Sequence, residues 1–93
     1  MEIDVRGTRV VLRDKLGARD SWPLRNLLAK SKQGDDVGFE EESAALALVV
    51  ESWGFEGDPH DVESYANLDL ADYMALDSQV AQYVVRRMAA PKN

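Results

Sequence analysis

The side chains best suited to chemistry gather around the only histidine of the sequence. His60 lies between Asp58 and Asp61, a pattern that would fit a general base oriented by a carboxylate. No nucleophile and no second base accompany it, and the chain contains no cysteine. We therefore interpret His60 as a polar residue in the first turn of a helix, and we predict that the protein is not an enzyme.

Three more acids, Glu63, Asp69 and Asp72, offer the oxygen ligands that divalent cations prefer. Their spacing differs from that of a calcium-binding loop, and Asp69 and Asp72 suit the start of a helix. The glycines do not follow the spacing of a phosphate-binding loop. We expect no catalytic residue, no metal and no cofactor.

Large apolar side chains are the other candidates for function. Trp22, Trp53 and Phe55 are big enough either to fill the core or to anchor a partner. The sequence leaves both roles open, and we name these three as candidate partner-binding residues.

Charge is strongly segregated along the chain. The net charge is −6, but residues 1–32 carry +4, residues 33–85 carry −13 without a single Lys or Arg, and residues 86–93 carry +3. Such a pattern can attract within one chain or between copies, so we expect a homo-oligomer. Phosphate would be repelled by most of the chain, so we expect no nucleic-acid partner. The candidate self-association residues are Arg9, Arg13, Arg19, Arg25, Glu40, Glu41, Glu42, Glu51 and Glu56.

These residues belong to a chain of 93 residues, the length of one small domain. Residues 1–13 alternate around Gly7 and predict a β-hairpin. Residues 21–88 form the expected helical body, and residues 89–93 a frayed tail. The longest apolar run has seven residues, far short of the about 20 that a membrane helix needs. We expect a soluble, cytoplasmic protein without a membrane partner.

The helical body shows apolar residues at three- and four-residue spacing. Leu46, Val49, Val50 and Trp53 extend one such stripe, which favours a helix up to Trp53; a strand over residues 46–51 is the alternative. The expected fold class is α+β, mainly helical, with about four helices and a short N-terminal β-hairpin. The expected helices cover residues 21–31, 39–53, 59–67 and 70–87.

Several segments, taken in order, resemble the small tail assembly chaperones of long-tailed (siphovirus-type) bacteriophages and prophages. A tryptophan that closes a helix, an acidic Gly-Asp-Pro turn, a short helix and a final helix recur in that family. The resemblance covers about residues 5–85, and it is carried by Val10–Arg13, ARDSWPLRNLLAK (18–30), VVESWGFEGDP (49–59) and DVESYANLDLADYMAL (61–76).

The resemblance implies a function. Such chaperones bind the long, helical tape measure protein and keep it soluble in the host cytoplasm until tail-tube protein polymerises around it. A longer form, made by ribosomal frameshifting, recruits the tube protein, and Pro91-Lys92-Asn93 can be encoded by a slippery run of bases. The alternative is a small acidic phage adaptor or structural subunit, either a head–tail connector or an inhibitor that mimics nucleic acid.

Overall fold

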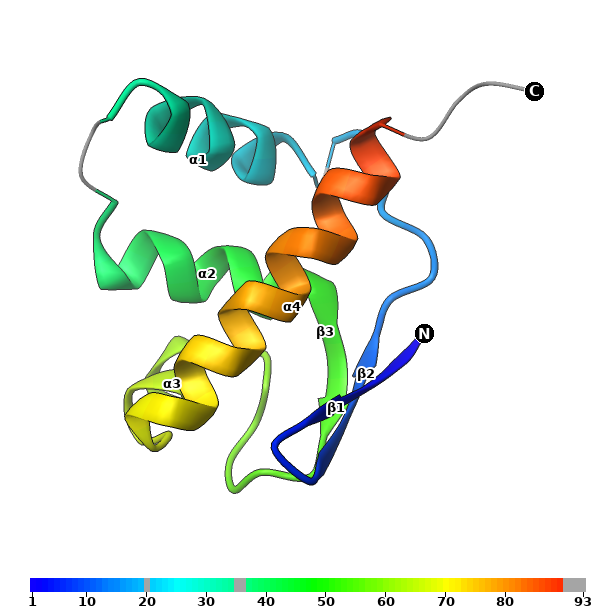
Figure 1. The fold of residues 1–93 in the computed structure, drawn as a ribbon, viewed down its shortest axis with the longest axis vertical. Helices are drawn as coiled ribbons and strands as arrows, with labels where there is room; N and C mark the ends of the chain where they lie inside the picture. The colour runs from blue at the N-terminus through cyan, green and yellow to red at the C-terminus, as the bar shows by residue number, and fades with distance from the viewer. Residues whose placement is uncertain (20, 35–36, 90–93) are drawn as a thin grey trace.

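The computed structural model describes residues 1–19, 21–34 and 37–89, and Figure 1 shows its fold. Within these residues the elements are β1 (Glu2–Val5), β2 (Thr8–Leu12), α1 (Trp22–Lys32), α2 (Phe39–Val49), β3 (Val50–Trp53), α3 (Val62–Ala66) and α4 (Leu70–Ala89). The predicted class, α+β and mainly helical with an N-terminal hairpin, is confirmed. Residues 90–93 of the expected tail lie outside the described residues.

The hairpin closes through a two-residue turn. β1 and β2 pair antiparallel with Val5 opposite Thr8, which leaves Arg6 and Gly7 as the turn. Both have positive φ, 52° and 91°, as the favoured two-residue hairpin turn requires. The side chains of Val5, Val10 and Leu12 are fully buried, so this small hairpin is stabilised by the helices that cover it.

The prediction of a helix up to Trp53 is wrong. α2 ends at Val49, and Val50–Trp53 form β3, which pairs antiparallel with β2 through Val10↔Trp53 and Val11↔Ser52. The main chain continues this contact at both ends, since Arg13 N–H donates to Val49 O (2.9 Å) and Gly54 N–H donates to Arg9 O (2.9 Å). β2 thus occupies the centre of a three-stranded sheet with the order β1-β2-β3.

The third helix begins later than expected. α3 starts at Val62 rather than near Pro59, because Asp61 is its N-cap and accepts a hydrogen bond from Glu63 N–H (3.1 Å). Asp69 plays the same part for α4, accepting from Ala71 N–H (3.1 Å), as the sequence predicts.

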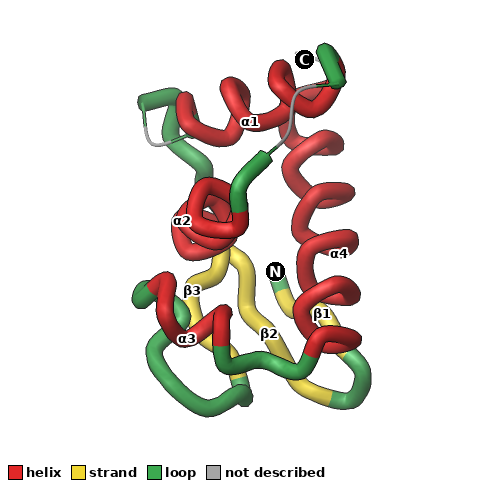
Figure 2. The backbone as a smooth tube through the Cα atoms, turned by 90° about the vertical axis from the view of Figure 1, so that its left-hand side faces the viewer, coloured by secondary structure: helices red, strands yellow, loops and turns green. Residues whose placement is uncertain are grey.

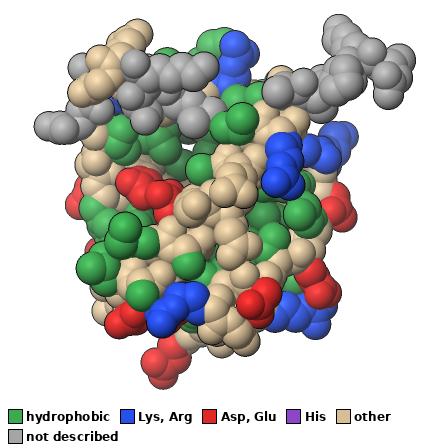
Figure 3. All heavy atoms as spheres, viewed as in Figure 1, with side chains coloured by type: hydrophobic (Ala, Val, Ile, Leu, Met, Phe, Trp, Pro, Cys, Tyr) green, Lys and Arg blue, Asp and Glu red, His purple; other side chains and the backbone are tan. Residues whose placement is uncertain are grey.

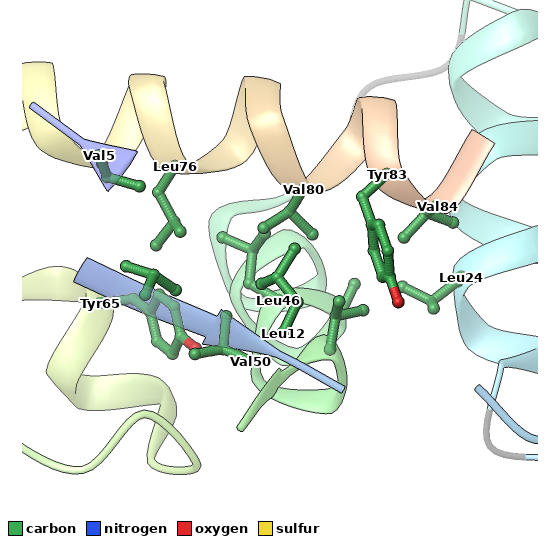
Figure 4. Close-up of a cluster of buried hydrophobic side chains, with 13 residues drawn as sticks. Val5, Leu12, Leu24, Leu46, Val50, Tyr65, Leu76, Val80, Tyr83 and Val84 are labelled. Atoms are coloured by element: carbon green, nitrogen blue, oxygen red, sulfur yellow. The ribbon is translucent and has the colours of Figure 1, made fainter. Parts of the chain in front are cut away.

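The core lies between the sheet and the helices. Figure 2 shows α4 running beside the sheet, while α1 lies across the far end of the molecule, over α2 and the last turns of α4. Figure 4 shows the buried side chains between α4 and β2. The core residues are Val5, Val10, Leu12, Leu24, Ala45, Leu46, Val49, Val50, Tyr65, Leu76, Val80, Tyr83 and Val84.

Candidate partner-binding surfaces

The acidic turn around His60 is a structural unit. Asp58 accepts a hydrogen bond from His60 N–H (2.9 Å), and its carboxylate lies 3.4 Å from His60 Nδ1. Asp61 is occupied as the cap of α3. All three side chains are exposed, so the hydrogen bonds of a turn account for their arrangement.

Asp69 and Asp72 join the hairpin to α4. The Arg6 guanidinium lies 3.5 Å from Asp69 and 3.1 Å from Asp72. Both acids therefore have partners within the fold. In the described part of the chain, His, Asp and Glu form no group of three that could hold a metal ion.

Trp53 and Phe55 stand at the end of the sheet beside α3. The Trp53 ring centroid lies 4.8 Å from that of Tyr65 and 5.4 Å from that of Phe55, and its Nε1–H donates to Gly57 O (2.9 Å). Tyr65 is buried, donates to Pro59 O (2.7 Å), and has its pKa raised by this burial. Trp53 and Phe55, both half-buried, thus hold the 54–61 loop against α3.

Trp22 lies at the other end of the molecule. It begins α1, is 56% exposed, and has the Arg25 guanidinium 4.8 Å from its ring centroid. The three aromatic candidates therefore do not form one surface. Of the three, Trp22 has the free area that a partner contact needs.

The candidate charged residues remain spread over the surface. Arg9 pairs with Glu2 on the neighbouring strand, and Glu41 with Lys30 of α1 (3.1 Å). Within the residues that the structure describes, no ion pair joins the four candidate arginines to the five candidate glutamates. The two sets are thus not brought together inside one molecule, and contact between them would require a second copy.

Three hollows that the sequence did not predict surround α1. A small one, about 50 Å³, lies between α1, α2 and α4, and Leu24 and Leu27 form its α1 side. A second, of about 350 Å³, separates α1 from α2 beside Ala44 and Leu48. A third, of about 640 Å³, lies between α1 and the end of α4. We call these three hollows the α1 grooves.

Two carboxyl groups border the α1 grooves. Asp77 of α4 and Glu42 of α2 both line the smallest hollow. Burial raises the pKa of Asp77 to about 7, and Glu42 adds to this rise because its carboxylate accepts a hydrogen bond from the protonated Asp77 and repels the charged form. Nearby, Tyr73 OH lies 3.4 Å from Ser43 Oγ, and burial raises the pKa of Tyr73 to about 12. The sequence signal for the pair of Asp77 and Glu42 is that an acid, Asp77, lies between the apolar residues Leu76 and Val80.

Comparison with known proteins adds no relative. No protein-family model matches the chain, nor does any curated protein or solved structure. In the described part of the chain, none of the helices combines the length and hydropathy of a membrane span. The α1 grooves are the feature of the fold that is best suited to binding a partner.

Proposed function

We propose that this protein is a non-enzymatic tail assembly chaperone, which holds hydrophobic helical segments of a tape measure protein in the α1 grooves. The observation that carries the proposal is the set of three hollows beside one exposed helix, of which the first and second are mainly apolar and the third also has Ser21, Arg25 and Arg87 in its lining. Binding of an amphipathic helix in an apolar groove is a common mode of recognition. The site of action is the host cytoplasm, and tail-tube protein is recruited through a longer form of the chain.

α1 is attached to the body in a way that suits such binding. Among the α1 side chains that the structure describes, Leu24 is buried and Leu27 is half-buried, whereas Trp22, Pro23 and Arg25 are exposed. Because hollows lie on several sides of this helix, it can shift to admit a partner without opening the sheet. An element with few buried contacts opens at a low free-energy cost.

The charge of the chain supports the same role. With a net charge of −6, copies that coat an apolar client repel one another and so oppose aggregation. Glu41 and Lys30, which pair beside the second hollow, give the apolar floor a polar border. An apolar centre with a polar rim is the usual anatomy of a protein interface.

The alternative of a nucleic-acid mimic finds less support. A mimic needs its acids on one continuous, unpaired surface. Here Arg6 pairs with Asp69 and Asp72, and Lys30 pairs with Glu41, so cations interrupt the acidic surface.

Co-expression tests the proposal. The tape measure protein of the same genome is produced alone, with the wild-type chain, with Ala44→Arg, or with Ala66→Arg. Ala44 is exposed and lines the second hollow, whereas Ala66 is exposed on α3, away from α1. We expect the wild type and Ala66→Arg to keep the client in the soluble fraction, and Ala44→Arg to lose most of this effect. A client that stays insoluble with the wild type would overturn the proposal.

A further inference from the structure

α4 carries a second apolar stripe besides the one that faces the core. Leu70, Met74, Val85 and Met88 are 71%, 61%, 48% and 42% exposed, and Ala81 between them is also exposed. On a helix these five positions fall within about 60° around the axis. The core residues of α4, such as Leu76 and Val80, lie on a different side.

The stripe runs the length of the helix. From Leu70 to Met88 it covers a rise of about 27 Å. Figure 3, in the same view as Figure 1, shows hydrophobic side chains open to solvent on the face of the molecule that α4 crosses. A long exposed apolar strip of this kind marks an interaction surface.

The two halves of the stripe have complementary shapes. In the first half, Leu70 and Met74 are long side chains with large exposed fractions. In the second half, a shallow hollow of about 370 Å³ is lined by Ala81, Gln82, Val85 and Arg86. A protruding side chain of one helix packs into such a four-residue hole on another.

The two halves are also complementary in charge. The first half of α4 and its cap carry Asp69, Asp72 and Asp77; Arg6 pairs with the first two, and this end keeps a net negative charge, whereas the second half carries Arg86 and Arg87. Within residues 1–19, 21–34 and 37–89, neither of these two arginines forms an ion pair. Antiparallel pairing of two copies places the acidic half of each helix opposite the basic half of the other, whereas parallel pairing places like charges together.

We propose that two copies of this chain associate through the exposed stripe of α4, with the two helices antiparallel. Met74 of each copy fits the hollow between Ala81 and Arg86 of the other. This register places Leu70 opposite Met88 and the twofold axis near residue 79. Each surface then meets itself, as a closed dimer requires. The proposal does not depend on the chaperone function, because Leu70, Met74 and Val85 lie outside the α1 grooves. Of the stripe, Ala81 borders the first groove and Met88 the third.

The first test measures mass in solution by sedimentation and light scattering. We expect the wild type to have twice the chain mass at about 0.1 mM, and Met74→Arg to raise the dimer dissociation constant at least about tenfold. Arginine at position 74 would be buried in the partner's hollow beside Arg86, so that like charges meet. Trp22→Arg is the matched control, because it makes the same kind of change at an exposed apolar residue outside the stripe, and it should stay dimeric. Circular dichroism checks that both variants fold.

The second test uses the absence of cysteine from the chain. Ser78 lies next to the twofold axis, and in this register its two copies are offset by only about 3 Å along the helices. Under mild oxidation, Ser78→Cys should therefore give a disulfide-linked dimer, whereas Leu70→Cys, whose copies would lie about 27 Å apart, should not. Cross-linking of Leu70→Cys alone would show parallel pairing and overturn the register. A monomeric wild type, or a Met74→Arg variant with an unchanged dimer dissociation constant, would overturn the proposal itself.

Discussion

Arg6 has an unfavourable backbone conformation, but its side chain makes favourable contacts with the start of α4. A φ of 52° is rare for a residue with a Cβ and costs about 1–2 kcal/mol relative to the right-handed region. Asparagine or glycine would occupy this turn position more readily. The arginine is instead placed where its side chain reaches Asp69 and Asp72 at the start of α4. The turn residue thus ties the hairpin to the longest helix.

Gly57 is required both by its backbone and by its neighbour. Its φ is +90°, and a Cβ at this position would lie 2.6 Å from Ser64 Oγ of α3. We expect Gly57→Ala to lower the free energy of unfolding by about 2–3 kcal/mol, the sum of left-handed strain and a steric clash. Chemical denaturation measures this loss.

Gly34→Ala is the matched control for that substitution. Gly34 also has a positive φ, +79°, but a Cβ there would meet nothing within 4 Å. Only the strain should remain, about 1 kcal/mol. Equal losses for the two variants would show that Ser64 adjusts and that the close approach is unimportant.

At the scale of elements, the sequence predicted most of the helices and the hairpin because their signals are local. Apolar spacing identifies α4, and alternation around Gly7 identifies β1 and β2. β3 could not be separated from α2 in the same way. Val49, Val50 and Trp53 fit a helical stripe, and the strand forms only because β2 offers its free edge to Val50–Trp53.

The α1 grooves lay beyond sequence reasoning for a related physical reason. The hollows depend on the orientation in which α1 packs against α2 and α4. No residue within α1 determines that orientation by itself. The charge pattern and Trp22 pointed to a binding role but not to its place. Asp77 gave a weak sequence signal, because it is an acid within an apolar stripe. That Glu42 is its partner became visible only in the fold.

Trp53 fastens β3 to α3, so its removal should loosen two elements together. It packs on Tyr65 and Phe55 and donates to Gly57 O. We expect Trp53→Ala to lower the free energy of unfolding by about 2–3 kcal/mol. This loss is at or below the low end of what replacement of a buried tryptophan by alanine usually costs, because the Trp53 ring is half-buried. Urea titration followed by circular dichroism measures this. A loss below about 1 kcal/mol combined with a loss of client binding would instead identify Trp53 as a contact residue.

Across the whole molecule, the uneven charge of the chain is only partly neutralised by folding. Arg6 and Lys30, from the basic first third, reach acids of the later elements. Of the remaining candidate glutamates, Glu40, Glu51 and Glu56 stay exposed, and Glu42 is half-buried. Much of the surplus negative charge therefore faces solvent, where it opposes aggregation.

The pair of Asp77 and Glu42 makes the stability of the whole fold depend on pH. The pKa of Asp77 is raised from 3.8 to about 7 in the folded protein, first by burial and then by Glu42. Between these two values the folded chain holds a proton that the unfolded chain has lost, so stability falls as pH rises through this window. Because Asp77 is only half-buried, solvent screening limits the effect to about 1–2 kcal/mol.

Replacement of the acid by its neutral amide isolates this contribution. We expect Asp77→Asn to remove that part of the pH dependence and, at about pH 8, to be more stable than the wild type by about 1 kcal/mol, because no charge is then buried beside Glu42. Urea titrations at about pH 5 and about pH 8 measure both differences. Glu56→Gln, at an exposed acid outside the pair, is the control and should keep the wild-type slope. If Asp77→Asn keeps that slope as well, the proton is held elsewhere, and the α2–α4 contact does not sense pH.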